Sequence, residues 1–400
     1  MTLAALICAY HESGEPGDGL RATLPLAGRT VVERQARLAA AAGADSVIIL
    51  VERLPPALIA AIDRMRGEGV RAIVARGVAE AAESVQPEDR LLLVADGLVI
   101  AESHLDRLAG AEGDALLTIA DHLTDDRFER IDAQSRWAGL AMVDGDLLRR
   151  TAAMLQDWDL QSTLLRRAVQ GGARQLAIRD ADDEPLLIAE REEDLDEAEA
   201  RIVESAAGAR TDWASRFLLA PVERAATALL MPSAITPRWL HLVAAAFTGL
   251  AAFLFHKDWL WAGALLVLLA TPLDGIADRI AALRLQPTPR HGRWRYLLPA
   301  LSGAALATLS LSLAPTRGWG CIALAATTIA FLLARHGESG GGDIPGRSAL
   351  AERKGMAWLM LPFAVTGYWT IGLATLAAYA AASFFWAQRQ VHAPLDPPQD

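Results

Sequence analysis

Apolar residues are spread very unevenly along this chain of 400 residues, and their distribution limits its possible folds more than any other feature. Six apolar runs follow residue 230, and each approaches the roughly 17–20 residues needed to cross the core of a bilayer. We predict that they form an all-α, six-helix transmembrane domain over residues 233–390; a large buried helical domain is the alternative. The runs are Leu240–Phe255, Trp259–Leu273, Leu297–Ala314, Cys321–Ala334, Met356–Ile371 and Leu373–Trp386.

Basic residues are concentrated in alternate connections between these runs, after the second run and after the fourth. This is the positive-inside pattern, and it predicts a multi-pass protein of the cell inner membrane whose N-terminal domain and C-terminus are cytoplasmic. Nine of the eleven tryptophans also follow residue 210, most of them near predicted membrane interfaces. The basic residues are Arg279, Arg284, Arg290, Arg293, Arg295, Arg335, Arg347, Arg353 and Lys354.

Residues 1–204 have a different pattern, which is typical of a soluble α/β domain. Short β-rich runs alternate with Ala-rich stretches of helical period, and this predicts βαβ units around a mostly parallel sheet. Strands are expected at Leu3–Cys8, Ser46–Val51, Ala72–Ala75 and Leu91–Val94. The net charge of −10 argues against a nucleic-acid partner, because binding phosphates requires an excess of basic residues.

Two shorter segments flank the membrane domain. Residues 205–232 interleave large apolar and charged side chains, which favours an amphipathic helix lying in the membrane interface. An ordinary linker helix is the alternative for this segment. Residues 391–400 are rich in proline, and we expect them to form a disordered tail.

A pair of carboxylates stands near the end of the second apolar run. Asp274 and Asp278 are four residues apart, so a helix places them on one face, where they can bind a divalent cation. Arg279 and Arg284 follow, where their side chains can bind phosphate. These surroundings resemble the CDP-alcohol phosphotransferase family, with its motif D-x-x-D-G-x-x-A-R followed by G-x-x-x-D-x-x-x-D. The matching segments are Ile235–Pro237, Asp212–Arg216, Leu273–Gly275, Leu283–Gln286 and Gly292 with Trp294.

The resemblance implies a six-helix membrane enzyme that transfers a phosphoalcohol from a CDP-linked donor to an acceptor alcohol, with four aspartates binding Mg²⁺. It also implies a homodimer through the membrane domain. This chain keeps Asp274 and Gly292 of the motif, Gly275 belongs to the matching flank Leu273–Gly275, and Asp278 stands at the motif's glycine position. The other three aspartate positions hold Ala277, Tyr296 and Ala300. Because a two-metal site needs several carboxylates, we predict that phosphotransfer by this half is absent or very weak.

The first predicted strand is followed by a glycine loop and then by Arg21. With Ala41–Val51, Leu91–Ile100 and Gly139–Leu147, this loop resembles the GT-A-like nucleotidylyltransferases, which have a Rossmann-like α/β fold. The resemblance implies that loop amides bind a triphosphate, that Arg21 replaces the family's lysine, and that Asp96 is a Mg²⁺ ligand. The nucleotide-binding residues it implies are Gly14, Gly17, Gly19, Arg21 and Asp96.

The N-terminal half also departs from the family that it resembles. The position of the second metal-binding aspartate falls on Ile188, with Glu190 nearby. His11 stands in the loop without a counterpart in the motif, and we interpret it as a residue with no functional role.

With both resemblances, the architecture of this chain is similar to that of fused inositol-phosphate cytidylyltransferase and phosphodiester synthase proteins. In those proteins one domain supplies a CDP-alcohol to the other at high effective concentration. Two hypotheses follow. The first is a divergent enzyme of phospholipid or polyol-phosphate synthesis that uses CTP or a CDP-alcohol, membrane lipids, and Asp96 and Asp274 as remaining metal ligands. The second is a non-catalytic pseudoenzyme that binds a nucleotide, lipid or partner protein at the membrane. The sequence leaves both open, and plain transport ranks last.

Overall fold

The computed structural model describes residues 2–14, 19–121, 126–155, 159–178, 185–205, 212–231, 233, 235–285, 296–338 and 349–391. The chain divides into two compact units. The α/β unit comprises Met1–Ala206 with Leu283–Gln286, and the helical unit comprises Ala207–Ala282 with Pro287–Asp400. Gly17, Gly292 and residues 392–400 of the predicted tail lie outside the described residues.

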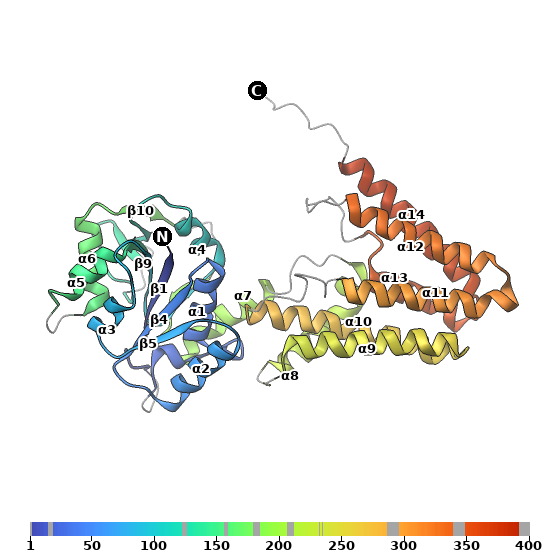
Figure 1. The fold of residues 1–400 in the computed structure, drawn as a ribbon, viewed down its shortest axis with the longest axis horizontal. Coiled ribbons are helices and arrows are strands. Elements are labelled where there is room, and N and C mark those ends of the chain that lie inside the picture. Colours follow the sequence, from blue (N-terminus) through green and yellow to red (C-terminus); the bar gives the residue numbers. More distant parts are fainter. Residues whose placement is uncertain are drawn as a thin grey trace, which may run out of the picture. The chain divides into compact units, whose positions relative to one another are not determined.

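The α/β unit is built on a mixed sheet of seven strands in the order β10-β8-β9-β6-β1-β4-β5 (Figure 1). Strand β9 runs antiparallel to both of its neighbours, whereas the other pairs are parallel. The predicted mostly parallel sheet is therefore confirmed, with one antiparallel strand that the sequence pattern did not reveal. The strands are β1 (Leu3–Cys8), β4 (Ser46–Leu50), β5 (Ala72–Ala75), β6 (Arg90–Val94), β8 (Ala115–Ala120), β9 (Ser135–Asp144) and β10 (Arg174–Ala177).

Strand β1 lies inside this sheet, between β6 and β4, and its residues Ala4–Cys8 are buried because helices cover both faces. Two small antiparallel pairs, β2 with β3 and β7 with β11, accompany the main sheet. These are β2 (Pro25–Leu26), β3 (Arg29–Thr30), β7 (Leu98–Ile100) and β11 (Leu186–Ile188). The helices are α1 (Val31–Ala41), α2 (Pro56–Gly67), α3 (Val78–Glu83), α4 (Glu102–Ala109), α5 (Gly145–Ala152), α6 (Leu160–Gln170) and α7 (Asp196–Ser205).

Among its described residues, the helical unit contains four helices that are long and apolar enough to cross a membrane: α9, α10, α11 and most of α14. Only 22–39% of the most apolar window of each is buried. A helical domain in water would bury its apolar face, so this exposure favours a membrane-spanning unit over the buried alternative. The helices are α8 (Ala220–Leu230), α9 (Pro237–His256), α10 (Leu260–Leu283), α11 (Leu297–Arg317), α12 (Gly320–Glu338), α13 (Arg353–Val365) and α14 (Trp369–Val391).

The remaining two predicted spans differ from the structure. The described apolar part of α12, Gly320–Arg335, is shorter than a full span. The predicted run Met356–Ile371 is divided between α13, which has 13 residues, and the start of α14. A turn at Gly367, with a φ of +77°, separates the two helices. Hydropathy did not reveal this turn, because its flanks are apolar on both sides.

Candidate functional sites

Asp96 is held in one orientation just beyond the end of β6. Its side chain is buried, with 3% of the residue exposed. Oδ2 accepts hydrogen bonds from the backbone N–H of Tyr10 at 2.9 Å and of His11 at 2.7 Å, and it lies 3.2 Å from Nδ1 of His11. Oδ1 is buried and has no hydrogen-bond partner among the described residues. The carboxylate therefore has one fully engaged oxygen and one buried oxygen without a hydrogen-bond partner among the described residues.

The loop after β1 folds back on itself beside this carboxylate. A bridge joins Glu12 to Leu20, and the N–H of Ser13 donates to the carbonyl of Gly19 at 2.9 Å. The N–H of Gly14 donates to the carbonyl of Glu190 at 2.8 Å, which ties the loop to the segment after β11. Because β1 and β6 are parallel neighbours, their carboxyl ends meet at one edge of the sheet and bring this loop to Asp96.

Gly97 allows a third segment to approach the same edge. It has a φ of +71°, and a Cβ there would lie 2.6 Å from the carbonyl oxygen of Ala189 and 3.3 Å from Cβ of Arg21. Arg21 forms an ion pair with Glu190, so its charge is already matched. Ile188, at the position of the family's second aspartate, is buried in the hydrophobic core. The structure thus brings Asp96, Arg21 and Glu190 to one region.

Three further residues near Asp96 were not singled out from the sequence. Gln161 accepts a hydrogen bond from the N–H of Asp96 at 3.3 Å, and the hydroxyl of Tyr10 donates to Asp159. Burial, together with the neighbouring Cys8 and Asp159, raises the pKa of Tyr10 and keeps its phenol neutral. Asp159 caps the N-terminus of α6, where its side chain accepts a hydrogen bond from the N–H of Ser162 at 2.8 Å. A helix N-cap is the only role that the sequence indicates for this residue.

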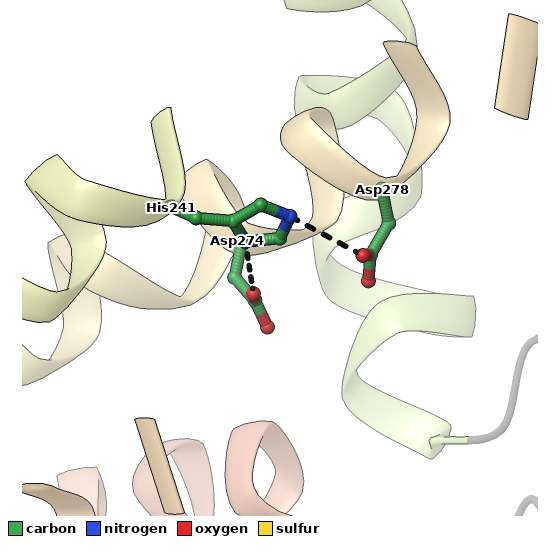
Figure 2. Close-up of side chains that lie close together, drawn as sticks. All are labelled: His241, Asp274 and Asp278. Atoms are coloured by element: carbon green, nitrogen blue, oxygen red, sulfur yellow. Dashed lines mark hydrogen bonds and ion pairs between the residues drawn. The ribbon is translucent and has the colours of Figure 1, made fainter. Parts of the chain in front are cut away.

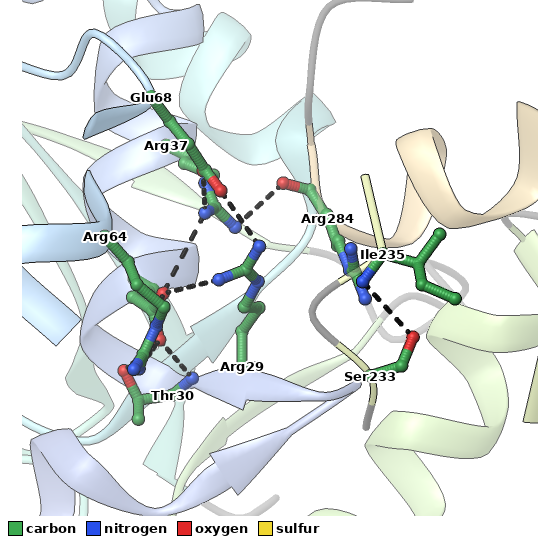
Figure 3. A network of polar contacts seen from close by, with 9 residues as sticks. Arg29, Thr30, Arg37, Arg64, Glu68, Ser233, Ile235 and Arg284 are labelled. Atoms are coloured by element: carbon green, nitrogen blue, oxygen red, sulfur yellow. Dashed lines mark hydrogen bonds and ion pairs between the residues drawn. The ribbon is translucent and has the colours of Figure 1, made fainter. Parts of the chain in front are cut away.

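A second polar cluster in the α/β unit is built around Glu33, which is fully buried. Figure 3 shows its neighbours Thr30, Arg37 and Arg64. Arg64 donates to its carboxylate through Nε at 3.0 Å and Nη2 at 2.8 Å. Arg37, which also pairs with Glu68, donates through Nη1 to the carbonyl of Arg284 at 3.0 Å. Arg284 itself is 2% exposed. This cluster therefore binds the backbone of Arg284 within the α/β unit, and the buried Arg284 side chain is not displayed at a phosphate site.

In the helical unit, His241 of α9 lies between the two aspartates of α10 (Figure 2). Its Nδ1 is 3.1 Å from Oδ1 of Asp274, and its Nε2 is 3.6 Å from Oδ1 of Asp278. Oδ2 of Asp274 accepts a hydrogen bond from Nη2 of Arg353, at the start of α13. Both oxygens of Asp274 are therefore engaged by protein groups, whereas the sequence alone had indicated only the two aspartates.

The remaining charges near this cluster are also matched. Glu223 of α8 is buried and pairs with Arg279 at 3.3 Å and with Lys354 at 3.7 Å. Gly275 allows this approach, because a Cβ there would lie 2.0 Å from Oε1 of Glu223. Arg279, which the sequence placed where it can bind phosphate, thus forms an ion pair with Glu223 inside the helical unit.

Asp212 binds the start of α13 to the segment before α8. It accepts the N–H of Gly355 at 2.6 Å and that of Ala214 at 3.2 Å. Burial raises the pKa of Asp212, although these two amide hydrogen bonds oppose that shift. A Cβ at Gly355 would lie 2.5 Å from Asp212 Oδ1, so glycine is needed for this contact.

The two regions differ in how well they fit Mg²⁺. In the α/β unit, the buried and unpartnered Oδ1 of Asp96 suits an ion that takes one or two carboxylates and completes its shell with water and phosphate oxygens. In the helical unit, Ala277 is fully buried, while Tyr296 and Ala300 are exposed. The four-carboxylate set that the resemblance implies is therefore reduced there to Asp274, whose oxygens are already engaged.

No protein-family model matches the sequence, and no curated protein matches it either.

Proposed function

We propose that this chain is a membrane protein whose α/β unit binds a Mg²⁺-nucleoside triphosphate, with CTP as the nucleotide that the sequence resemblance favours. The observation that carries the proposal is the buried, unpartnered Oδ1 of Asp96 beside the loop after β1. Asp96 would hold Mg²⁺ through this oxygen, and the loop would supply backbone N–H groups to the phosphates. The bound ion would neutralise phosphate charge.

The membrane unit, in this proposal, anchors the nucleotide-binding unit and does not carry out CDP-alcohol phosphotransfer. The support comes from Asp274, whose two oxygens face His241 and Arg353. A carboxylate engaged in this way is a poor general base for an acceptor hydroxyl, since each of its oxygens is already directed at a protein group. The protein is then a membrane-bound nucleotide-binding pseudoenzyme.

A second candidate function is nucleotidyl transfer within the α/β unit. The observation in its favour is Glu190, which lies at the same edge of the sheet as Asp96 and pairs with Arg21. If a triphosphate drew Arg21 away, Glu190 would offer a second carboxylate to the metal. The two candidates share the binding site and differ only in turnover.

Titration of the purified full-length protein in detergent with Mg-CTP and Mg-CDP, followed by calorimetry, tests the proposal. We expect saturable binding that Asp96→Asn weakens by at least about tenfold, since a contact to a charged group contributes about 1.5–3 kcal/mol. Asp63→Asn, on the exposed face of α2, is the matched control and leaves binding unchanged. Absence of binding by the wild-type protein would overturn the proposal.

A turnover assay on the same samples separates the two candidates. Release of pyrophosphate from CTP in the presence of polyol phosphates, lost in both Asp96→Asn and Glu190→Gln, would establish the transferase. Binding without product supports the pseudoenzyme. Transfer of a phosphoalcohol from a CDP-linked donor by the wild-type protein would contradict the assignment of the membrane unit.

A further inference from the structure

We propose that His241, Asp274 and Asp278 form a site for one borderline divalent cation, of which Zn²⁺ is the type. The three groups come from α9 and α10, and they can each offer one ligand atom with all three atoms within 4.8 Å of one another. Their side chains are largely buried, at 12%, 15% and 22% exposed. This site is separate from the Asp96 site and does not depend on the proposed nucleotide binding.

The donor set decides which class of cation fits. An imidazole nitrogen with two carboxylate oxygens suits Zn²⁺ and neighbouring transition metals, whereas Mg²⁺ prefers an all-oxygen shell. His241 stands 33 residues before Asp274, outside the aspartate motif, so the site differs in composition from the one that the resemblance implies. Three protein ligands also leave a fourth tetrahedral position open for water or a lipid phosphate oxygen.

Arg353 supports such a site by holding Oδ2 of Asp274, the oxygen that faces away from His241. It binds Oδ2 of Asp274, so Oδ1, on the side of His241, remains the oxygen that can bind the metal. Metal-binding carboxylates are commonly held in this way by a second hydrogen-bond partner. The guanidinium thereby fixes the direction of Oδ1.

Metal binding requires a small local rearrangement. The ring of His241 now faces one aspartate with each nitrogen (Figure 2), and a single ion accepts only one of these nitrogens. Zn²⁺ holds nitrogen and oxygen ligands at roughly 2.0–2.2 Å, so the three ligand atoms must draw closer together than 4.8 Å. Rotation about the side-chain bonds of His241, Asp274 and Asp278 would bring the ligand atoms together, while α9 and α10 keep their positions along the chain.

Equilibrium dialysis of the full-length protein in detergent against Zn²⁺, with elemental analysis of the dialysed sample, tests this inference. We expect one equivalent of Zn²⁺ per chain that a hundredfold excess of Mg²⁺ does not displace. His241→Gln and Asp278→Asn should each lower the bound metal at least tenfold. His256→Ala removes an exposed imidazole from the other end of α9 and should retain the full equivalent.

Two further measurements keep the result interpretable. Circular dichroism and gel filtration establish that the variants remain folded, and the wild-type protein with Co²⁺ should show the intense visible absorption of a four-coordinate ion. Asp96→Asn should leave Zn²⁺ stoichiometry unchanged, so failure of this site and failure of nucleotide binding are distinguishable. Zn²⁺ bound equally by wild type and His241→Gln, displacement by Mg²⁺, or no binding by wild type would each overturn the inference.

Discussion

The two units each contain a buried aspartate at a position that a sequence motif would mark as a metal ligand, yet the two carboxylates are placed differently. Oδ2 of Asp96 takes all of its hydrogen bonds, and Oδ1 is left without a partner among the described residues. Both oxygens of Asp274 face protein groups, namely His241 and Arg353. The same residue type can thus carry a carboxylate with one unpartnered oxygen, called open below, in one unit and an internal ion pair in the other.

Glu33 sharpens this comparison, because it shows a fully engaged carboxylate inside the α/β unit as well. Two nitrogens of Arg64 bind it, and the backbone N–H and hydroxyl of Thr30 each donate to it at 2.9 Å. We therefore expect engaged carboxylates to determine stability and the open carboxylate to determine ligand binding.

The largest expected effect is that of Glu33→Ala. Removing a fully buried partner leaves the surrounding arginines without compensation, and we expect a loss of about 3–5 kcal/mol in the stability of the α/β unit. Denaturant unfolding followed by hydrogen exchange in β1 and α1 measures it. Glu83→Ala, at the end of α3, is a control outside the cluster. Comparable losses in both variants would show that the cluster contributes no special stability.

The same residue gives the α/β unit a predicted acid sensitivity. Burial alone raises the pKa of Glu33, but hydrogen bonds from Arg64 and Thr30 outweigh burial and leave it lowered. A lowered folded-state pKa means that this stability is present above the unfolded value, about 4.3, and is lost as the pH falls through the folded value. Denaturant midpoints are measured at a series of pH values from 7 to 3. The midpoint of the wild-type protein should decrease once the pH is below about 4.3, and that of Glu33→Gln should decrease less steeply.

A smaller loss, of about 3 kcal/mol, is expected for Arg353→Ala in the helical unit, because it leaves Asp274 in a poorly hydrated environment. Arg353→Met combined with Asp274→Asn removes both charges and should recover part of the loss. Thermal unfolding in detergent measures the series, with the exposed Arg238→Ala as control. A double variant less stable than Arg353→Ala would contradict the view that this pair is chiefly an internal charge balance.

The contrast between these carboxylates also explains how far the sequence could be used to predict the structure. The alternation of β-rich and helical segments predicted the α/β unit, and apolar runs predicted the long helices, because both are local patterns. The spacing of Asp274 and Asp278 likewise placed them together. His241 and Arg353 lie 33 and 79 residues from Asp274, so no local pattern announced them. The open oxygen of Asp96 depends on the orientation that the Tyr10 and His11 amides impose, which only the fold supplies.

The smallest expected effect concerns Gly97. It tests whether the close approach of the segment after β11, at Ala189 and Glu190, contributes to ligand binding at Asp96. Gly43 is its matched control, since it has a φ of +96° with nothing within 4 Å of an added Cβ. Gly97→Ala and Gly43→Ala should share a cost of about 1 kcal/mol for the left-handed backbone. Only Gly97→Ala also forces a Cβ to within 2.6 Å of the carbonyl of Ala189, and this should displace Glu190 from Arg21.

We therefore expect Gly97→Ala to weaken Mg-CTP binding several-fold and Gly43→Ala to leave it unchanged, with calorimetry as the measurement. Because both variants place an alanine at a positive φ and only Gly97→Ala adds the contact with Ala189, a difference between them reports chiefly that contact. Equal affinities would mean that the segment after β11 contributes nothing to ligand binding. The Asp96 carboxylate and the loop after β1 would then account for the site, and the case for Glu190 as a second metal ligand would be lost with it.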